Sequence, residues 1–324
     1  MMNLRRYTAS DAIAWDAFVE TSRNGTFLFR RSYMDYHSDR FRDHSLLFFD
    51  EKDHLIAMLP ANEAIAADGR KELYSHQGLT YGGLLLQPKA TAAMVLQVFE
   101  SLVRYAAEQG FSAIHYKAIP DIYHLCPSEE DEYAIWRVGG KLEQCLISST
   151  VPLNPYCQIE IERRRRRGLA RAEQEGLHIQ SGAPLSEFWP IMEDNLRSRY
   201  NVAPVHSLEE MQLLQGRMPQ FIRSFLVRDS RGNAVAGAVV YLCNKRTVHV
   251  QYGHATPQGK QSGALDLLYL SLIDAYRSEG FEYFDFGNSN EQRGLYLNEN
   301  LISQKEGFAA RGIVYKTYII DLVN

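Results

Sequence analysis

The chain has 324 residues, a formal net charge of −4 and a pI of about 6.2, with 45% hydrophobic and 23% charged residues. This composition excludes a wholly disordered chain, and the length suits two domains. The slightly acidic balance is not that of a dedicated DNA-binding protein.

The first half is expected to combine helices with short, mainly antiparallel strands. Apolar periodicity and turn residues predict helices at residues 12–22 and 90–109. Strands are predicted at 4–7, 45–49, 55–60, 81–86 and 111–118, and those at 45–49 and 55–60 form a hairpin. Gly110 supplies the expected end of the second helix.

The second half repeats this plan. Helices are predicted at residues 185–200 and 264–279. A hairpin of strands is predicted at 225–228 and 234–243, with further strands at 247–254 and 281–286. Gly110 and Gly280 end equivalent helices, and each is followed by Phe and a strand, which favours a duplication. We therefore predict an α+β fold with two tandem domains, residues 1–153 and 154–324, each a mixed, mostly antiparallel sheet flanked by helices.

A basic helix is expected at the start of the second domain, within residues 154–176. Arginines occupy all of positions 163–167, so they cover every face of a helix. At least one must therefore meet a carboxylate, a carbonyl or a phosphate. This run is consistent with two interpretations. In the first the helix is solvated and has internal ion pairs, and in the second it binds CoA, a nucleotide-linked acceptor or tRNA.

Targeting and redox signals are absent from the sequence. The most apolar segment, residues 264–276, is interrupted by Asp266, Ser271 and Asp274, so no membrane helix is predicted. The first residues lack the apolar run of a signal peptide. The four cysteines are scattered without CxxC spacing, and no HExxH motif occurs. We expect a cytoplasmic protein with no metal site and no membrane insertion.

Three segments together resemble the Fem-like family of tandem GNAT proteins. They are Phe284-Asp285-Phe286-Gly287 with Gln304-Lys305-Glu306-Gly307-Phe308, the basic stretch 163–175, and Ser75-His76-Gln77-Gly78-Leu79-Thr80-Tyr81-Gly82-Gly83. The family includes the enzymes that build peptidoglycan cross-bridges and bacterial relatives with an acetyltransferase domain. The resemblance implies two tandem GNAT-like domains. The first would be degenerate and serve the acceptor, and the second would hold the donor.

The resemblance also implies transfer of an acyl or aminoacyl group to an amine. Family members that use aminoacyl-tRNA often carry a long helical hairpin in the second half, and residues 177–301 leave no room for one. We therefore favour an N-acyltransferase with acetyl-CoA or another acyl-CoA as co-substrate, acting on a small-molecule or cell-envelope precursor acceptor. An aminoacyl-tRNA-dependent Fem-type peptide ligase is the alternative, with tRNA as partner. A non-catalytic, ligand-binding tandem GNAT protein is a further alternative.

The donor site is expected before the helix at 264–279. A GNAT domain holds the CoA pyrophosphate on backbone N–H groups at a helix N-terminus, reached through a glycine-rich turn. The segment departs from the usual GNAT pattern, since a lysine replaces the Arg or Gln and Leu265 stands where a small residue belongs. An ordinary loop before a helix is therefore the alternative. The predicted donor-binding residues are Gly259, Lys260, Gln261, Ser262, Gly263 and Ala264.

Catalytic and acceptor residues are predicted from residue chemistry. For Lys305 the family resemblance implies a fixed cation that stabilises developing negative charge on the donor carbonyl or phosphate, and the alternative is a surface lysine. Asp285 is the candidate base, or the solvent-facing carboxylate of its strand. Tyr252, with His254 beside it, is a further catalytic candidate. Acceptor binding, or in its place a tight strand entry without a ligand, is assigned to Ser75, His76, Tyr81, Arg199 and Tyr200. Asn288, Ser289 and Asn290, just beyond the strand at 281–286, are expected to orient the substrate.

Overall fold

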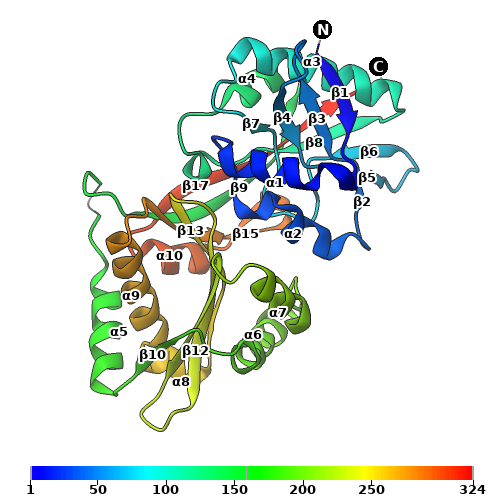
Figure 1. Cartoon of the computed structure of the whole chain (residues 1–324). Coiled ribbons are helices and arrows are strands. Elements are labelled where there is room, and N and C mark those ends of the chain that lie inside the picture. Colours follow the sequence, from blue (N-terminus) through cyan, green and yellow to red (C-terminus); the bar gives the residue numbers. More distant parts are fainter. Residues whose placement is uncertain (1, 158, 323–324) are drawn as a thin grey trace. The chain divides into compact units, whose positions relative to one another are not determined.

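A computed structural model describes residues 2–157 and 159–322 (Figure 1). The chain divides into two compact units. Unit 1 comprises Met1–Leu146 with Val314–Asn324, and unit 2 comprises Ile147–Ile313. The chain enters unit 2 within β9 (Lys141–Pro152) and returns to unit 1 within β17 (Arg311–Asp321). The domain limits predicted from the sequence, 1–153 and 154–324, stay a prediction.

Unit 1 contains strands of two sheets. One has the order β1-β3-β4-β7, and the other contributes the order β17-β8-β6-β5-β2. The strands are β1 (Asn3–Arg6), β2 (Arg42–Asp43), β3 (Leu46–Phe49), β4 (Leu55–Leu59), β5 (Asn62–Ile65), β6 (Lys71–Tyr74), β7 (Leu85–Leu86) and β8 (Ala113–Lys117). The helices are α1 (Ala12–Thr21), α2 (Arg31–Met34), α3 (Ala92–Glu108) and α4 (Glu130–Arg137).

Helix α3 shows how the sequence pattern forms the core of unit 1. The Thr91 side chain accepts a hydrogen bond from the backbone N–H of Met94 and so caps the start of the helix. Val98, Phe99 and Leu102 then recur on one face and are at most 1% exposed. The helix ends before Gly110, whose positive φ of 75° suits glycine.

Unit 2 is built on six strands in the order β10-β11-β12-β13-β14-β9. Neighbouring strands are antiparallel except β13 and β14, which are parallel. The strands are β10 (His178–Ser181), β11 (Ile222–Arg228), β12 (Ala234–Leu242), β13 (Thr247–Ala255), β14 (Tyr283–Asn288), β15 (Asn290–Glu291) and β16 (Tyr296–Leu297). The helices are α5 (Arg163–Gln174), α6 (Leu185–Tyr200), α7 (Leu208–Arg217), α8 (Pro257–Ser262), α9 (Ala264–Ser278) and α10 (Glu299–Glu306).

Helices cover both faces of the unit 2 sheet. On one face Phe188 of α6 packs against Gly237 of β12 and the His254 ring of β13. On the other, Tyr269 of α9 packs against Gly253, the neighbour of His254. Figure 1 shows α5 beside α9, with β12 between this pair and α6. The predicted α+β class, with mostly antiparallel sheets flanked by helices, is confirmed.

Two expected elements differ from the structure. The strand expected over 81–86 is reduced to β7, because Gly82 and Gly83 fold tightly against the carbonyls of Ser75 and Lys117. The glycine-rich turn expected before α9 is largely the short helix α8. Thr256 accepts a hydrogen bond from the N–H of Gly259 and caps α8, and Pro257 stands at its first position.

Within the part of the chain that the structure describes, no helix has both the length and the apolar character needed to cross a membrane. Over the same residues, no group of three or more His, Cys, Asp or Glu side chains is arranged to hold a metal ion.

Candidate functional site

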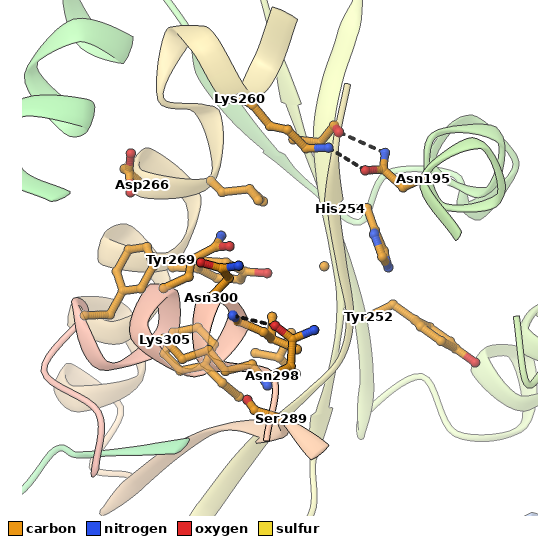
Figure 2. Close-up of a pocket in the computed structure, with 18 of the residues that line it drawn as sticks. Asn195, Tyr252, His254, Lys260, Asp266, Tyr269, Ser289, Asn298, Asn300 and Lys305 are labelled. Carbon is orange, nitrogen blue, oxygen red and sulfur yellow. Dashed lines mark hydrogen bonds between the residues drawn. The ribbon is translucent and has the colours of Figure 1, made fainter. Parts of the chain in front are cut away.

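Unit 2 contains a cavity of about 680 Å³ where two parallel strands separate. The pairing of β13 with β14 runs through three positions and ends at His249 and Asp285, although both strands continue beyond this point. The cavity is bordered by the continuing part of β13, by α9 and by α10 (Figure 2). Strand backbone beyond His249 therefore faces a space that a ligand can enter.

A bulge and a glycine shape the β13 wall. Val239 and Val240 of β12 pair with Tyr252 and Val250, so Gln251 is an extra residue that bends the strand. A methyl group on Gly253 would come within 1.8 Å of the Tyr269 hydroxyl oxygen. Glycine at this position therefore lets the tyrosine approach the strand, and both residues line the cavity.

One end of the cavity is basic. Arg164, Arg165 and Lys260 line it, together with Gly263 and Asp266 at the start of α9. Arg165 donates to Asp266 over 2.9 Å and stacks on the Phe308 ring at 4.7 Å. The buried Nε of Arg165 has no hydrogen-bond partner among the described residues. Burial raises the pKa of Asp266, and the guanidinium beside it lowers the pKa in part. This end suits an anionic group such as a phosphate.

The two helices at this end meet through two glycines. A Cβ on Gly263 would lie 2.2 Å from the carbonyl oxygen of Gly168 in α5, and Gly263 has a φ of 80°. Glycine therefore allows α5 to cross directly over the start of α9. The sequence prediction that an arginine of this run must find a polar partner agrees with the bonds of Arg164 to Ser303 and of Arg165 to Asp266.

Lys305 lies at the cavity on α10. Its ammonium donates to the backbone carbonyls of Gly287 and Asn288, over 2.8 and 2.7 Å. Burial lowers the pKa of Lys305 from 10.5 to about 8, and the charge of Asp285 acts in the opposite direction. The lysine thus fixes the last two residues of β14, and its charge lies beside the cavity. Its catalytic role stays a prediction.

Asp285 is fully buried, with 0% exposure, and is not part of the cavity wall. Its carboxylate accepts hydrogen bonds from Ser148 and Thr150, over 2.5 and 2.8 Å, and lies 2.8 Å from Nδ1 of His249. The carboxylate is therefore enclosed by its partners, and the role of Asp285 as a base stays a prediction.

Tyr252 borders the cavity, but its hydroxyl points away from it in Figure 2. That oxygen lies 2.6 Å from Nδ1 of His206, and the ring packs edge-on against Trp189. Burial raises the pKa of Tyr252 to about 12. The side chain therefore ties β13 to α6 and to the loop that follows it, and a catalytic role for Tyr252 stays a prediction.

Three of the six predicted donor-binding residues line the cavity: Gly259, Lys260 and Gly263. The ammonium of Lys260 donates to Asn195 of α6 over 2.5 Å (Figure 2). The other three are Gln261, Ser262 and Ala264, and they are absent from its wall. The hydroxyl of Ser262 donates to Gly259 within α8, and Ala264 is part of the hydrophobic core.

The predicted acceptor residues of unit 1 are packed inside that unit. Ser75, His76 and Tyr81 are between 1% and 3% exposed. Ser75 accepts from the N–H of Lys117, His76 stacks on His37 at 5.0 Å, and Tyr81 packs on Tyr123 at 4.5 Å. Burial lowers the pKa of His76 to about 3, so its ring is neutral.

The remaining acceptor predictions fall in unit 2. The side chains of Arg199 and Tyr200 lie outside the described residues. Asn288 ends β14, and its buried Oδ1 lacks a hydrogen-bond partner within the described part of the chain. Cavity residues that sequence reasoning did not select include Asn195, Gln251, Gly253, Tyr269 and Gln304. Gly253 carried a local signal, as a glycine inside an apolar strand, and Gln304 belongs to a segment that carried the family resemblance.

Comparison with known proteins identifies this architecture as an acyltransferase fold. Residues 160–293 match the family described as "Acetyltransferase (GNAT) domain". This segment is therefore a GNAT domain, and the chain as a whole has the tandem GNAT fold of Fem-like proteins. The resemblance stated from the sequence is confirmed. No curated protein matches the chain in sequence.

Solved structures share the fold over nearly the whole chain. FemX matches with a TM-score of 0.70 and 11% identity, covering 98% of this chain and 97% of its own. L-PGS from Bacillus licheniformis matches with a TM-score of 0.60 and 14% identity, covering 99% and 94%. A tandem GNAT protein from the clavulanic acid biosynthesis pathway matches with a TM-score of 0.53 and 11% identity, covering 100% and 99%. These likenesses establish the fold.

Proposed function

We propose that this protein is an N-acyltransferase that transfers an acetyl or other acyl group from acyl-CoA to an amine. The observation that carries the proposal is the cavity between the separating strands β13 and β14, with a basic end beside the start of α9. An extended chain with amide groups can hydrogen-bond to the free edge of β13, as a strand would. The phosphates of the same molecule would meet Arg164, Arg165 and Lys260.

In the proposed reaction, the nitrogen of a neutral amine attacks the carbonyl carbon of the thioester. A C–N bond forms and the C–S bond breaks. The leaving thiolate takes a proton from an acid of the cavity wall, and the proton that the attacking nitrogen gives up restores that acid. Tyr269 is the proton donor we assign to the thiolate, because its side chain lines the cavity and its hydroxyl lies against Gly253 of the β13 wall. Burial raises the pKa of Tyr269, so the phenol is protonated when the thiolate forms.

Lys305 has a defined place in this scheme. It holds the carbonyls of Gly287 and Asn288, so it keeps the cavity side of β14 in position. Its buried positive charge also favours the negative charge that develops on the carbonyl oxygen during attack. The acceptor, a small molecule or a cell-envelope precursor, would enter from the side of α10.

Aminoacyl-tRNA is the second candidate donor, and one observation favours it. Arg163, Arg166 and Arg167 of α5 are exposed, and none has an ion-pair partner among the described residues. An exposed basic face is the feature that binds a phosphate backbone. FemX and L-PGS, which share the fold, make this alternative worth testing directly.

Calorimetry with acetyl-CoA tests the proposal. We expect binding, and about tenfold weaker binding for Lys260→Met, since loss of one charged contact costs on the order of 1.4 kcal/mol. Lys245→Met is the matched control, because Lys245 is an exposed lysine of unit 2 outside the cavity wall. Absence of heat with any acyl-CoA would reject the proposal. Binding of charged tRNA that weakens steeply with salt would favour the second candidate. Failure of both ligands would leave a non-catalytic binding protein.

A further inference from the structure

The two ends of the unit 2 cavity differ in chemistry. Lys260 and Asn195 lie at one end in Figure 2, with Lys305, Asn298 and Ser289 at the other. The cation at the second end is already engaged, because Lys305 bonds two backbone carbonyls. The other polar groups there are one carboxylate, that of Glu291, which accepts from Asn298, and neutral groups that include the amides of Asn300 and Gln304.

Asn300 and Gln304 are four residues apart on α10, so they share one helix face. Neither amide has a hydrogen-bond partner within the described chain, and both line the cavity. Asn298, by contrast, is committed to the fold: it accepts from the N–H of Leu301 and donates to Glu291. The amides of α10 therefore offer paired donors and acceptors to a neutral ligand.

Ser289 lies at the floor of this end. Its residue is 1% exposed, and its hydroxyl has no hydrogen-bond partner in the described part of the chain. A buried hydroxyl without a partner is costly, so a native protein that retains one has a reason elsewhere. Packing is not that reason, since alanine would fill almost the same volume.

The backbone around Ser289 is held on both sides. Its N–H donates to the carbonyl of Ile147 over 3.0 Å, and its carbonyl accepts from the N–H of Asn298 over 2.9 Å. The two preceding carbonyls, those of Gly287 and Asn288, are held by Lys305. The fold thus fixes the main chain completely at this point and leaves the hydroxyl for a ligand.

We propose that Ser289 is an acceptor-positioning residue, and that this end of the cavity takes an amine flanked by neutral hydrogen-bonding groups, either amides or hydroxyls. This inference rests on the proposed function, because it assigns the acceptor to the end opposite the phosphates. Peptide amines and amino sugars both carry this chemistry. A phosphate or carboxylate next to the amine would meet the carboxylate of Glu291 and the Lys305 ammonium, which already bonds two backbone carbonyls.

The first test needs no substrate. Ser289→Ala removes a hydroxyl that costs free energy in the ligand-free protein, so we expect an unchanged or higher melting temperature. Ser148→Ala is the matched control, because the equally buried Ser148 donates to Asp285. We expect the control to melt lower by several degrees, since it leaves a buried carboxylate short of a donor. A similar fall for Ser289→Ala would overturn the proposal, because it would show a structural role.

The second test measures binding of three small amines by ligand-detected NMR: glycinamide, D-glucosamine and ethylamine. We expect glycinamide or glucosamine to bind the wild type more tightly than ethylamine, and to lose about tenfold or more in affinity with Ser289→Ala. Which of the two binds identifies the source of the neutral groups. The proposal is overturned if neither exceeds ethylamine, or if the variant binds them as the wild type does.

Calorimetry with acetyl-CoA on the same variant separates this inference from the proposed function. We expect Ser289→Ala to bind acetyl-CoA as the wild type does, because Ser289 lies away from the basic end. If the wild type binds the amine probes through Ser289 but binds no acyl-CoA, the donor assignment fails and the acceptor site stands.

Discussion

Replacing Gly253 by alanine should block the cavity from within. The added methyl carbon would lie 1.8 Å from the hydroxyl oxygen of Tyr269 and 3.0 Å from its Cζ. The tyrosine ring cannot move away easily, because it packs edge-on against Phe286 and Phe308 with centroid distances of 5.0 and 5.5 Å. The strand or the helix must therefore shift.

The magnitude follows from the geometry. Forcing one extra carbon into a packed site costs about 1–3 kcal/mol. For a unit of this size that loss corresponds to a fall in melting temperature of about 2–12 °C. Tyr269→Phe removes the oxygen and leaves only the 3.0 Å contact with the ring. The double variant should therefore be more stable than Gly253→Ala alone, with a coupling energy of about 1–2 kcal/mol.

Urea unfolding followed by circular dichroism measures the stability, and calorimetry with acetyl-CoA measures donor binding. Gly237→Ala is the control, because its methyl group would collide with Phe188 and the carbonyl of Phe225, and none of these three residues lines the cavity. Both alanine variants should lose stability, and only Gly253→Ala should lose donor binding. Additive effects of Gly253→Ala and Tyr269→Phe, or equal donor binding by all variants, would refute the reasoning.

Three further predictions concern buried charges and a helix crossing. Burial raises the pKa of Asp131 to about 7, so the free energy of unfolding of unit 1 should fall by on the order of 4 kcal/mol as the pH rises from 4 to 7. Urea titrations at several pH values measure this fall, and Asp131→Asn should abolish it. Burial lowers the pKa of Lys305 from 10.5 to about 8. The free energy of unfolding of the wild type should therefore gain about 3 kcal/mol over that of Lys305→Met as the pH rises from 8 to 10.5. A constant difference between the two would show that the ammonium is not buried. Gly263→Ala should destabilise unit 2 by about 3 kcal/mol or more in thermal unfolding, because φ is 80° and the carbonyl oxygen of Gly168 lies 2.2 Å from the new carbon. Gly232→Ala is the control: its φ of 87° is also positive, but no neighbour lies within 4 Å, so it should cost only about 1–2 kcal/mol.

Helix prediction worked because its signals are local. The apolar stripes of α3 and α9 and the glycines that follow them occur within one segment, so periodicity and capping placed both helices within two residues of their ends. The resemblance that led to the tandem GNAT fold was carried by short motifs as well. The short strands β5 and β6 lacked any comparable signal.

The site itself depends on contacts that no local pattern encodes. Asp285 meets Ser148 and Thr150 across 137 and 135 residues of chain, and this pairing buries a carboxylate that the strand pattern left free to face solvent. Gly253 meets Tyr269 only because α9 packs across β13. The sequence alone determined the two-unit α+β class and the helix that begins near Ala264. The tertiary structure decided where β13 and β14 separate, and therefore which side chains line the cavity, because strand pairing and helix packing join residues that are distant in the chain.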